Sequence, residues 1–88
     1  MASHYPQAAY AVYAKKYTTV GGNAAEAISI PNILATDLAQ VTLVSGGTST
    51  RTLTKVVTTA NTVTVTFSGD PGSDAIIDLI VFRPTTNN

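Results

Sequence analysis

The chain has 88 residues, no cysteine, one histidine and a formal net charge of zero, with five Lys and Arg against five Asp and Glu. This composition excludes disulfide bonds and a metal site built from several histidines, and five scattered cations do not form the basic stripe of a nucleic-acid interface. The charged share is 11%, less than half the value of about 25% found in typical soluble domains. A thin core and few charges together favour self-association or attachment to a larger body.

No targeting or membrane segment is expected from the sequence. The N-terminal stretch has no basic region followed by a long apolar run, as a signal peptide would have. No window contains the roughly 20 apolar residues of a membrane helix. We therefore expect synthesis in a cytoplasm and no contact with a membrane.

Apolar and polar residues alternate with a period of two, which predicts strands with one face in a core and the other in water. The alternation is clearest where Thr62, Thr64 and Thr66 interleave with apolar residues. The branched Cβ of threonine suits a strand, and its hydroxyl tolerates solvent. Six strands are expected in chain order, at residues 9–20, 28–30, 38–45, 51–59, 62–68 and 75–83.

Short turns separate these segments, so the sequence predicts an all-β fold. We expect one small domain, a β-sandwich or barrel of about six mainly antiparallel strands. An N-terminal arm (1–8) precedes the β core (9–84), and a polar tail (85–88) follows it. Residues 24–27 could instead start a helical turn, but the strand is favoured.

The best-defined hairpin joins the strands at 51–59 and 62–68 through the tight reversal Ala60-Asn61. The alternation in the first of these strands places a set of side chains on one face of the sheet: Arg51, Leu53, Lys55 and Val57.

The last strand is apolar on both faces. Ile77, Leu79 and Val81 are expected to face the core, and the opposite face carries Ile76, Ile80 and Phe82, with Asp78 among them. A strand that is apolar on both faces is buried on both. Either a second layer packs over a central strand, or the outer residues form a subunit interface.

Four tyrosines form the other notable group: Tyr5, Tyr10, Tyr13 and Tyr17. In an unbroken strand Tyr13 and Tyr17 share a face, and Tyr10 lies on the other. Tyr10 could pack in the core while the others cover the surface. Alternatively, the arm and first strand could dock on a partner, because tyrosine offers a large flat contact with a polar tip. A sugar-binding platform would usually also contain tryptophan, and the chain has none.

No pattern in the chain predicts catalysis or a cofactor. His4 lies in the expected arm, and Asp70, Asp74 and Asp78 form the only acidic cluster. The glycine pairs lack the following helix of a phosphate-binding loop. The loop 70–74 could bind calcium through its oxygens, but it lacks the ligand spacing of an EF-hand, and a turn held by aspartate side chains is favoured. We expect no enzyme, no cofactor and no metal.

Three segments carry a resemblance to a known group. Residues 28–37 read Ile-Ser-Ile-Pro-Asn-Ile-Leu-Ala-Thr-Asp, residues 64–72 read Thr-Val-Thr-Phe-Ser-Gly-Asp-Pro-Gly, and residues 79–83 read Leu-Ile-Val-Phe-Arg. This order resembles small β-rich virion structural proteins of tailed bacteriophages, in which a Leu-Ala-Thr-Asp corner and a Thr-Phe-Ser-x-Asp-Pro-Gly turn precede a final strand ending in arginine. The likeness spans residues 28–83, about two thirds of the chain.

The resemblance implies a capsid decoration (cement) protein without catalytic residues, located on the virion and made in the cytoplasm of a host bacterium. Its partners would be the major capsid protein and further copies of itself, since such proteins often form trimers at symmetry axes. The interface would then use the four tyrosines together with Ile76, Ile80 and Phe82. The alternative is a phage fibre or adhesin-type module that binds glycans on a host surface.

Overall fold

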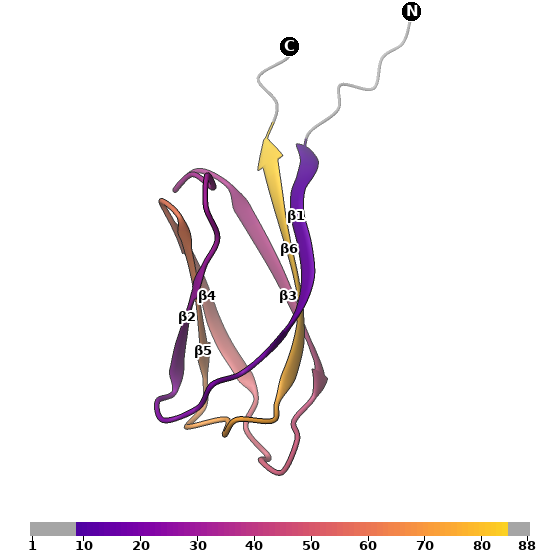
Figure 1. Cartoon of the computed structure of the whole chain (residues 1–88), viewed down its shortest axis with the longest axis vertical. Coiled ribbons are helices and arrows are strands. Elements are labelled where there is room, and N and C mark those ends of the chain that lie inside the picture. Colours follow the sequence, from indigo (N-terminus) through magenta and orange to yellow (C-terminus); the bar gives the residue numbers. More distant parts are fainter. Residues whose placement is uncertain (1–8, 85–88) are drawn as a thin grey trace, which may run out of the picture.

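The computed structural model describes residues 9–84, which form six strands in two antiparallel sheets (Figure 1). The expected arm and tail, and with them His4 and Tyr5, lie outside the described residues. In residues 9–84 there is no helix, so the expected all-β fold of six strands is confirmed. The strands are β1 (Ala9–Thr18), β2 (Ala25–Ser29), β3 (Leu38–Ser45), β4 (Leu53–Thr59), β5 (Thr62–Phe67) and β6 (Ile76–Pro84).

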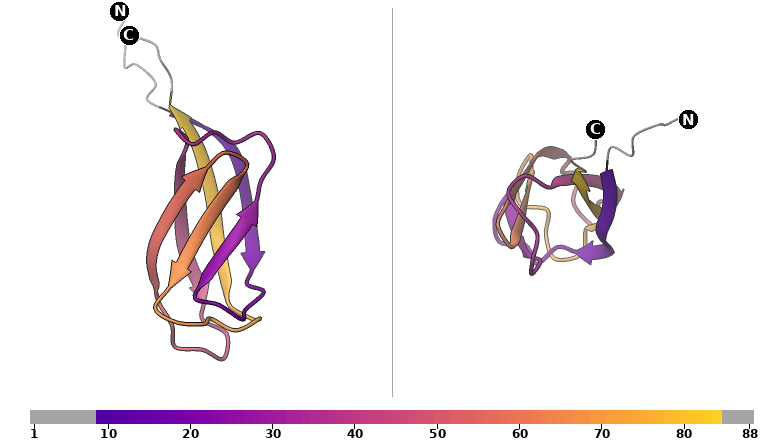
Figure 2. Two further views of the ribbon diagram at one scale, coloured as in Figure 1. Left: turned by 90° about the vertical axis from the view of Figure 1, so that its left-hand side faces the viewer. Right: turned by 90° about the horizontal axis from the view of Figure 1, so that it is seen from above.

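The strand order is β1-β6-β3 in one sheet and β2-β5-β4 in the other. The connection from β4 to β5 is the expected hairpin, and Asn61 adopts a positive φ of 62° in its turn. Every other connection crosses from one sheet to the other. The two sheets therefore lie face to face around one core, as in a sandwich (Figure 2).

The core comes mainly from the two central strands. In β5 the inward residues are Val63, Val65 and Phe67, and in β6 every second residue from Ile77 to Val81 is likewise buried. Their opposite-facing neighbours are half-buried, as the alternation predicts. The segment from β2 to the following loop completes the core with three isoleucines: Ile28, Ile30 and Ile33.

Two strand starts differ from the predicted ones by two residues or more, and the end of the first strand, predicted at residue 20, lies at Thr18. β2 begins at Ala25, earlier than the expected strand at 28–30, so residues 25–27 extend the strand instead of starting a helical turn. β4 begins at Leu53, not at Arg51.

Three of the four edge strands contain one extra residue relative to their partner. These residues are Val12 in β1, Val44 in β3 and Thr54 in β4. The central strands β5 and β6 have no extra residue in these pairings. Such bulges change which face the following side chains occupy, and they occur mainly on edge strands, where they oppose pairing with another chain.

The bulges overturn two predictions about shared faces. Tyr10 lies opposite Arg83 and Tyr13 opposite Val81, both on the inward side of β6, so Tyr10 shares the face of Tyr13 and Tyr17. In β4 the expected common side is also wrong. Leu53 lies opposite the buried Phe67, whereas Lys55 and Val57 lie opposite the outward threonines of β5.

Candidate functional site

The acidic side chains, which are the natural candidates for chemistry, are all engaged in internal contacts. Glu26 is 5% exposed, and its carboxylate accepts hydrogen bonds from the amides of Val20 (2.9 Å) and Gly21 (2.8 Å) and from the hydroxyl of Tyr17 (3.3 Å). Burial, and then the charge and hydrogen bonding of Glu26, raise the pKa of Tyr17 above 10.0. The hydroxyl of Tyr17 therefore stays protonated, and Glu26 holds the β1–β2 loop against β2.

Two further aspartates tie the loops at the same end of the sandwich. Asp70 accepts from the amides of Gly22 (3.0 Å) and Gly72 (2.9 Å), and Asp74 accepts from the amide of Thr48 (3.0 Å). The loop 70–74 is thus a turn held by aspartate side chains, the favoured prediction. In residues 9–84 no group of three or more His, Asp or Glu side chains is arranged to hold a metal ion.

At the opposite end, Arg83 and Asp37 form a partly buried ion pair. The Arg83 guanidinium donates through Nε to Oδ1 (2.9 Å) and through Nη2 to Oδ2 (2.8 Å) of Asp37, whose side chain has no exposed surface. Nη2 also donates to the carbonyl of Asn32 (3.0 Å), and the amide of Leu34 donates to Asp37 (2.8 Å). This pair fastens the β2–β3 loop to the end of β6.

The ion pair predicts a pH dependence of stability. The hydrogen bond from Arg83 lowers the pKa of Asp37 below its ordinary value of 3.8, although burial acts in the opposite direction. A group whose pKa is lowered by folding stabilises the folded state above its unfolded pKa, and this stability is lost as the pH falls through the folded pKa. We expect the melting temperature of the Asp37→Asn variant to be several degrees lower at pH 7 and to converge towards that of the wild type as the pH falls below 3.8 and through the lowered pKa of Asp37.

The measurement is thermal unfolding followed by circular dichroism between pH 2 and 8. Asp78→Asn is the matched control, because Asp78 pairs with Lys16 on the surface, where the two side chains are 46% and 62% exposed. Such pairs contribute about 0–1 kcal/mol, so this control should behave nearly as the wild type. Equal losses in both variants at pH 7 would show that the Arg83–Asp37 pair contributes no more to stability than the surface pair.

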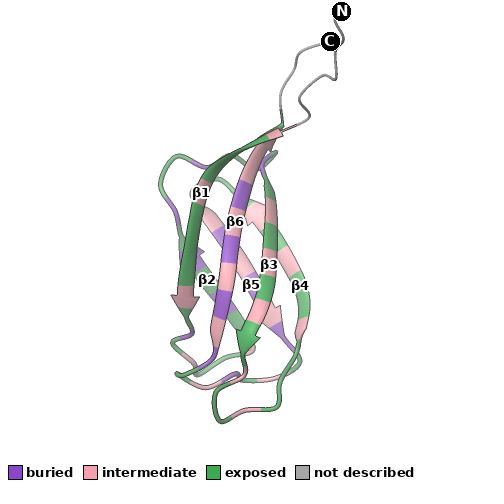
Figure 3. Cartoon of the chain, turned by 90° about the vertical axis from the view of Figure 1, so that its right-hand side faces the viewer, coloured by how far each residue is buried: buried purple, intermediate pink, exposed green. Residues whose placement is uncertain are grey.

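With the carboxylates so engaged, the outer face of the β1-β6-β3 sheet is the strongest candidate for a functional surface. Its central residues, on β6, are Ile76, Asp78, Ile80 and Phe82, all half-buried. No described element covers this face (Figure 3). The second sheet packs over the inward face of β6, so residues 9–84 do not supply a layer over the outward one.

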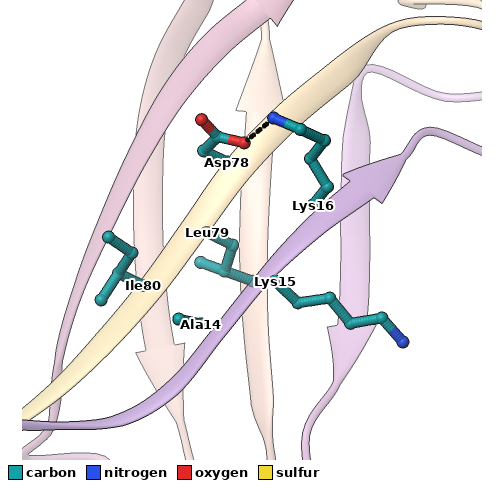
Figure 4. Close-up of a pocket in the computed structure, with 6 residues that line it drawn as sticks. All are labelled: Ala14, Lys15, Lys16, Asp78, Leu79 and Ile80. Atoms are coloured by element: carbon teal, nitrogen blue, oxygen red, sulfur yellow. Dashed lines mark hydrogen bonds and ion pairs between the residues drawn. The ribbon is translucent and has the colours of Figure 1, made fainter.

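A shallow hollow of about 280 Å³ lies on this face, between β1 and β6. It forms where the small Ala14 sits beside Ile80, and Lys16 and Asp78 border it with a 2.6 Å ion pair. Figure 4 shows Lys16 reaching Asp78, while Lys15 extends in another direction. Lys16 and Asp78 neutralise each other, and the other lining residues are the apolar Ala14, Leu79 and Ile80 together with Lys15.

The outer face of the other sheet differs in chemistry. Its register brings together alanine, serine and threonine residues with one cation and one exposed valine, namely Ala25, Ala27, Ser29, Lys55, Val57, Thr59, Thr62, Thr64 and Thr66. Threonine and serine side chains remain well hydrated on an exposed sheet. The sandwich therefore has one apolar outer face and one hydroxyl-rich outer face.

The structure separates the predicted interface residues into two groups. Ile76, Ile80 and Phe82 lie together on the apolar face. Tyr13 and Tyr17 pack instead against the core from the edge strand β1, and Tyr10 is 45% exposed beside Arg83. The tyrosines of β1 therefore do not extend the apolar face.

Three residues of the apolar face were missed by the sequence analysis. Ala11 and Leu38 flank Phe82 on its two sides, and Ala14 lies beside Ile80. Leu38 is 55% exposed. Leu38 and Val41 lie on opposite faces of β3, and the pairing with β6 brings Leu38 next to Phe82.

Comparison with protein-family models, curated proteins and solved structures finds no match to this chain. In residues 9–84 no helix is long and apolar enough to cross a membrane.

Proposed function

We propose that the chain is a non-enzymatic structural protein of a phage virion, a capsid decoration protein that binds the outer surface of the head and stabilises it. The observation that supports this most is the uncovered apolar face of the β1-β6-β3 sheet, with Ile80 and Phe82 at its centre. A small domain that keeps such a face gains stability when another surface covers it. The sequence resemblance adds the virion context.

The internal use of the carboxylates supports a non-enzymatic role. Each of the five acidic side chains accepts a hydrogen bond from within the domain. General acid–base chemistry requires a carboxyl group that can reach a substrate. Here the buried carboxylates, Glu26 and Asp37, are turned towards backbone amides, tyrosine and arginine instead.

Two contact regions follow from this proposal. The apolar face joins copies into a trimer, and residues 1–8 attach the trimer to the major capsid protein. The site of action is the capsid surface, after synthesis in the host cytoplasm. The glycan-binding alternative requires several exposed aromatic side chains at one loop end, and Tyr10 is the only exposed aromatic residue in the part of the chain that the structure describes.

The test uses heads purified from the virus whose genome encodes the chain, stripped of their own copies of the protein. We expect saturable co-sedimentation of the protein with these heads and a higher temperature of DNA release. A chain lacking residues 1–8 should bind at least tenfold more weakly while its melting temperature stays the same. Full attachment of the truncated chain would show that residues 1–8 are not needed for binding. Failure of the intact chain to attach would overturn the proposed function.

Charge on the apolar face gives a second prediction. Phe82→Asp should shift the protein from oligomer to monomer in light scattering, because an unpaired carboxylate would have to be desolvated in the contact. Thr64→Asp is the matched control, since it also places a carboxylate on a central strand, on the hydroxyl-rich face. An unchanged oligomer in a folded Phe82→Asp variant would show that this face does not join copies.

A further inference from the structure

The two sides of the apolar face differ in the size of their residues. In the row of Phe82, β1 contributes Ala11 and β3 contributes Leu38. In the next row, that of Ile80, β1 contributes Ala14 and β3 contributes Gln40. The β1 side is therefore low and the β3 side is high in these two rows, whereas in the row of Asp78 β1 contributes the longer Lys16 and β3 the shorter Thr42.

We infer that the occupant of this face is a second copy of the chain, whose β3 side packs on the β1 side of the first, about an axis parallel to β6. In this arrangement Leu38 of one copy lies over Ala11 of the next, and Gln40 lies over the hollow at Ala14. This inference rests on the self-association in the proposed function and specifies its geometry.

The charges on the apolar face are consistent with a second copy of the chain as its partner. Lys16 and Asp78 are its only charged residues in the register of the three strands, and they already pair at 2.6 Å. The face is therefore neutral overall, and a partner with excess charge of either sign would gain nothing from it. A second copy brings the same neutral pair, at the same level along the strands.

The edges of the sheets argue against the other common way for β proteins to associate. Val12 in β1 and Val44 in β3 interrupt the ladder on both edges of this sheet. Bulges on edge strands oppose the addition of a strand from another chain. This sheet would therefore associate with another copy through its outer face and not through its edges.

The area of the face limits how much surface the contact can bury. Nine residues of β6 in a sheet of three strands cover roughly 30 Å by 14 Å, or about 400 Å². A standard interface buries about 800 Å² on each partner. We therefore expect an association that depends on concentration in solution, and a covalent trap is the appropriate measurement.

The chain has no cysteine, so engineered thiols are its only ones. The variant Ala11→Cys/Leu38→Cys places one thiol on each side of Phe82. Within one copy these positions are two strand spacings apart, about 10 Å, and a disulfide requires Cα atoms within about 7 Å. Any disulfide in this variant must therefore join two copies.

Under mild oxidation we expect the double variant to form a closed covalent trimer on a non-reducing gel, while the two single variants stay monomeric. The pair Ala14→Cys/Gln40→Cys repeats the test in the next row. Ala27→Cys/Val57→Cys is the matched control, because these residues flank Thr64 in the same way on the hydroxyl-rich face. Circular dichroism confirms that each variant is folded.

Disulfides in the single variants equal to those in the double variants would overturn the large-on-small pairing, because like sides would then meet. So would an absence of disulfides in both double variants. A covalent dimer would keep the pairing but replace the three-fold axis of the proposed function by a two-fold axis. Attachment to heads is measured in a separate experiment. A negative disulfide result therefore does not overturn the proposed function, and a negative attachment result does not overturn the pairing of the two sides.

Discussion

Replacing Glu26 by alanine should lower the free energy of unfolding by about 3 kcal/mol, because buried hydrogen bonds to a charged group contribute about 1.5–3 kcal/mol each and are not additive. The substitution removes the acceptor of the amides of Val20 and Gly21 and of the hydroxyl of Tyr17. The β1–β2 loop would then lose its attachment to β2. Urea denaturation, with the slope compared between variants, measures the effect.

The control is Glu26→Gln, which keeps one carbonyl oxygen at nearly the same volume. That oxygen can still accept the hydrogen bond that Val20 donates, while the amide nitrogen cannot accept the one from Gly21. We expect a loss of about 1–2 kcal/mol, between those of the wild type and the alanine variant. A Glu26→Ala protein as stable as the wild type would show that water replaces the carboxylate without cost.

Replacing Gly21 by alanine should destabilise the domain by about 3 kcal/mol, for two reasons. The left-handed backbone conformation costs a residue with a Cβ about 1–2 kcal/mol, and the new Cβ would also clash with the neighbouring loop. Gly21 has a φ of 85°, and a Cβ there would lie 2.8 Å from the carbonyl carbon of Gly72. Because that atom belongs to the backbone, neither loop can yield by rotating a side chain.

Gly22 provides the control at the next position. Its φ is 96°, but a Cβ would meet no atom within 4 Å. Gly22→Ala therefore isolates the backbone cost, about 1–2 kcal/mol. Equal destabilisation in the two variants, measured by thermal unfolding, would mean that the approach of Gly21 to Gly72 is not tight.

The sequence predicted those features of the fold that depend on local alternation. In β5 and β6 the period of two is unbroken, and the predicted inward residues, Ile77, Leu79 and Val81, are the buried ones. Turn residues also marked the hairpin at Ala60-Asn61. These signals act over a few residues, so a single sequence carries them in full.

Features that depend on contacts between distant segments were not predicted. An extra residue such as Val12 or Thr54 is stabilised by the strand opposite, and nothing in the local pattern marks it. The pairing of Arg83 with Asp37 likewise joins residues 46 positions apart. For the candidate site, the alternation predicted Ile80 and Phe82, but the flanking residues on β1 and β3 became visible only with the strand order.

The pairing of β1 with β6 has a consequence for how the chain folds. Ala9 lies opposite Pro84, so the first described strand finds its partner only when the last has been synthesised. Until then β1 and β3 have no central strand to join, because both pair with β6. Folds dominated by such distant pairings fold slowly, over milliseconds to seconds. The β1-β6-β3 sheet can therefore be completed only once β6 has been synthesised, whereas all three strands of the β2-β5-β4 sheet come earlier in the chain.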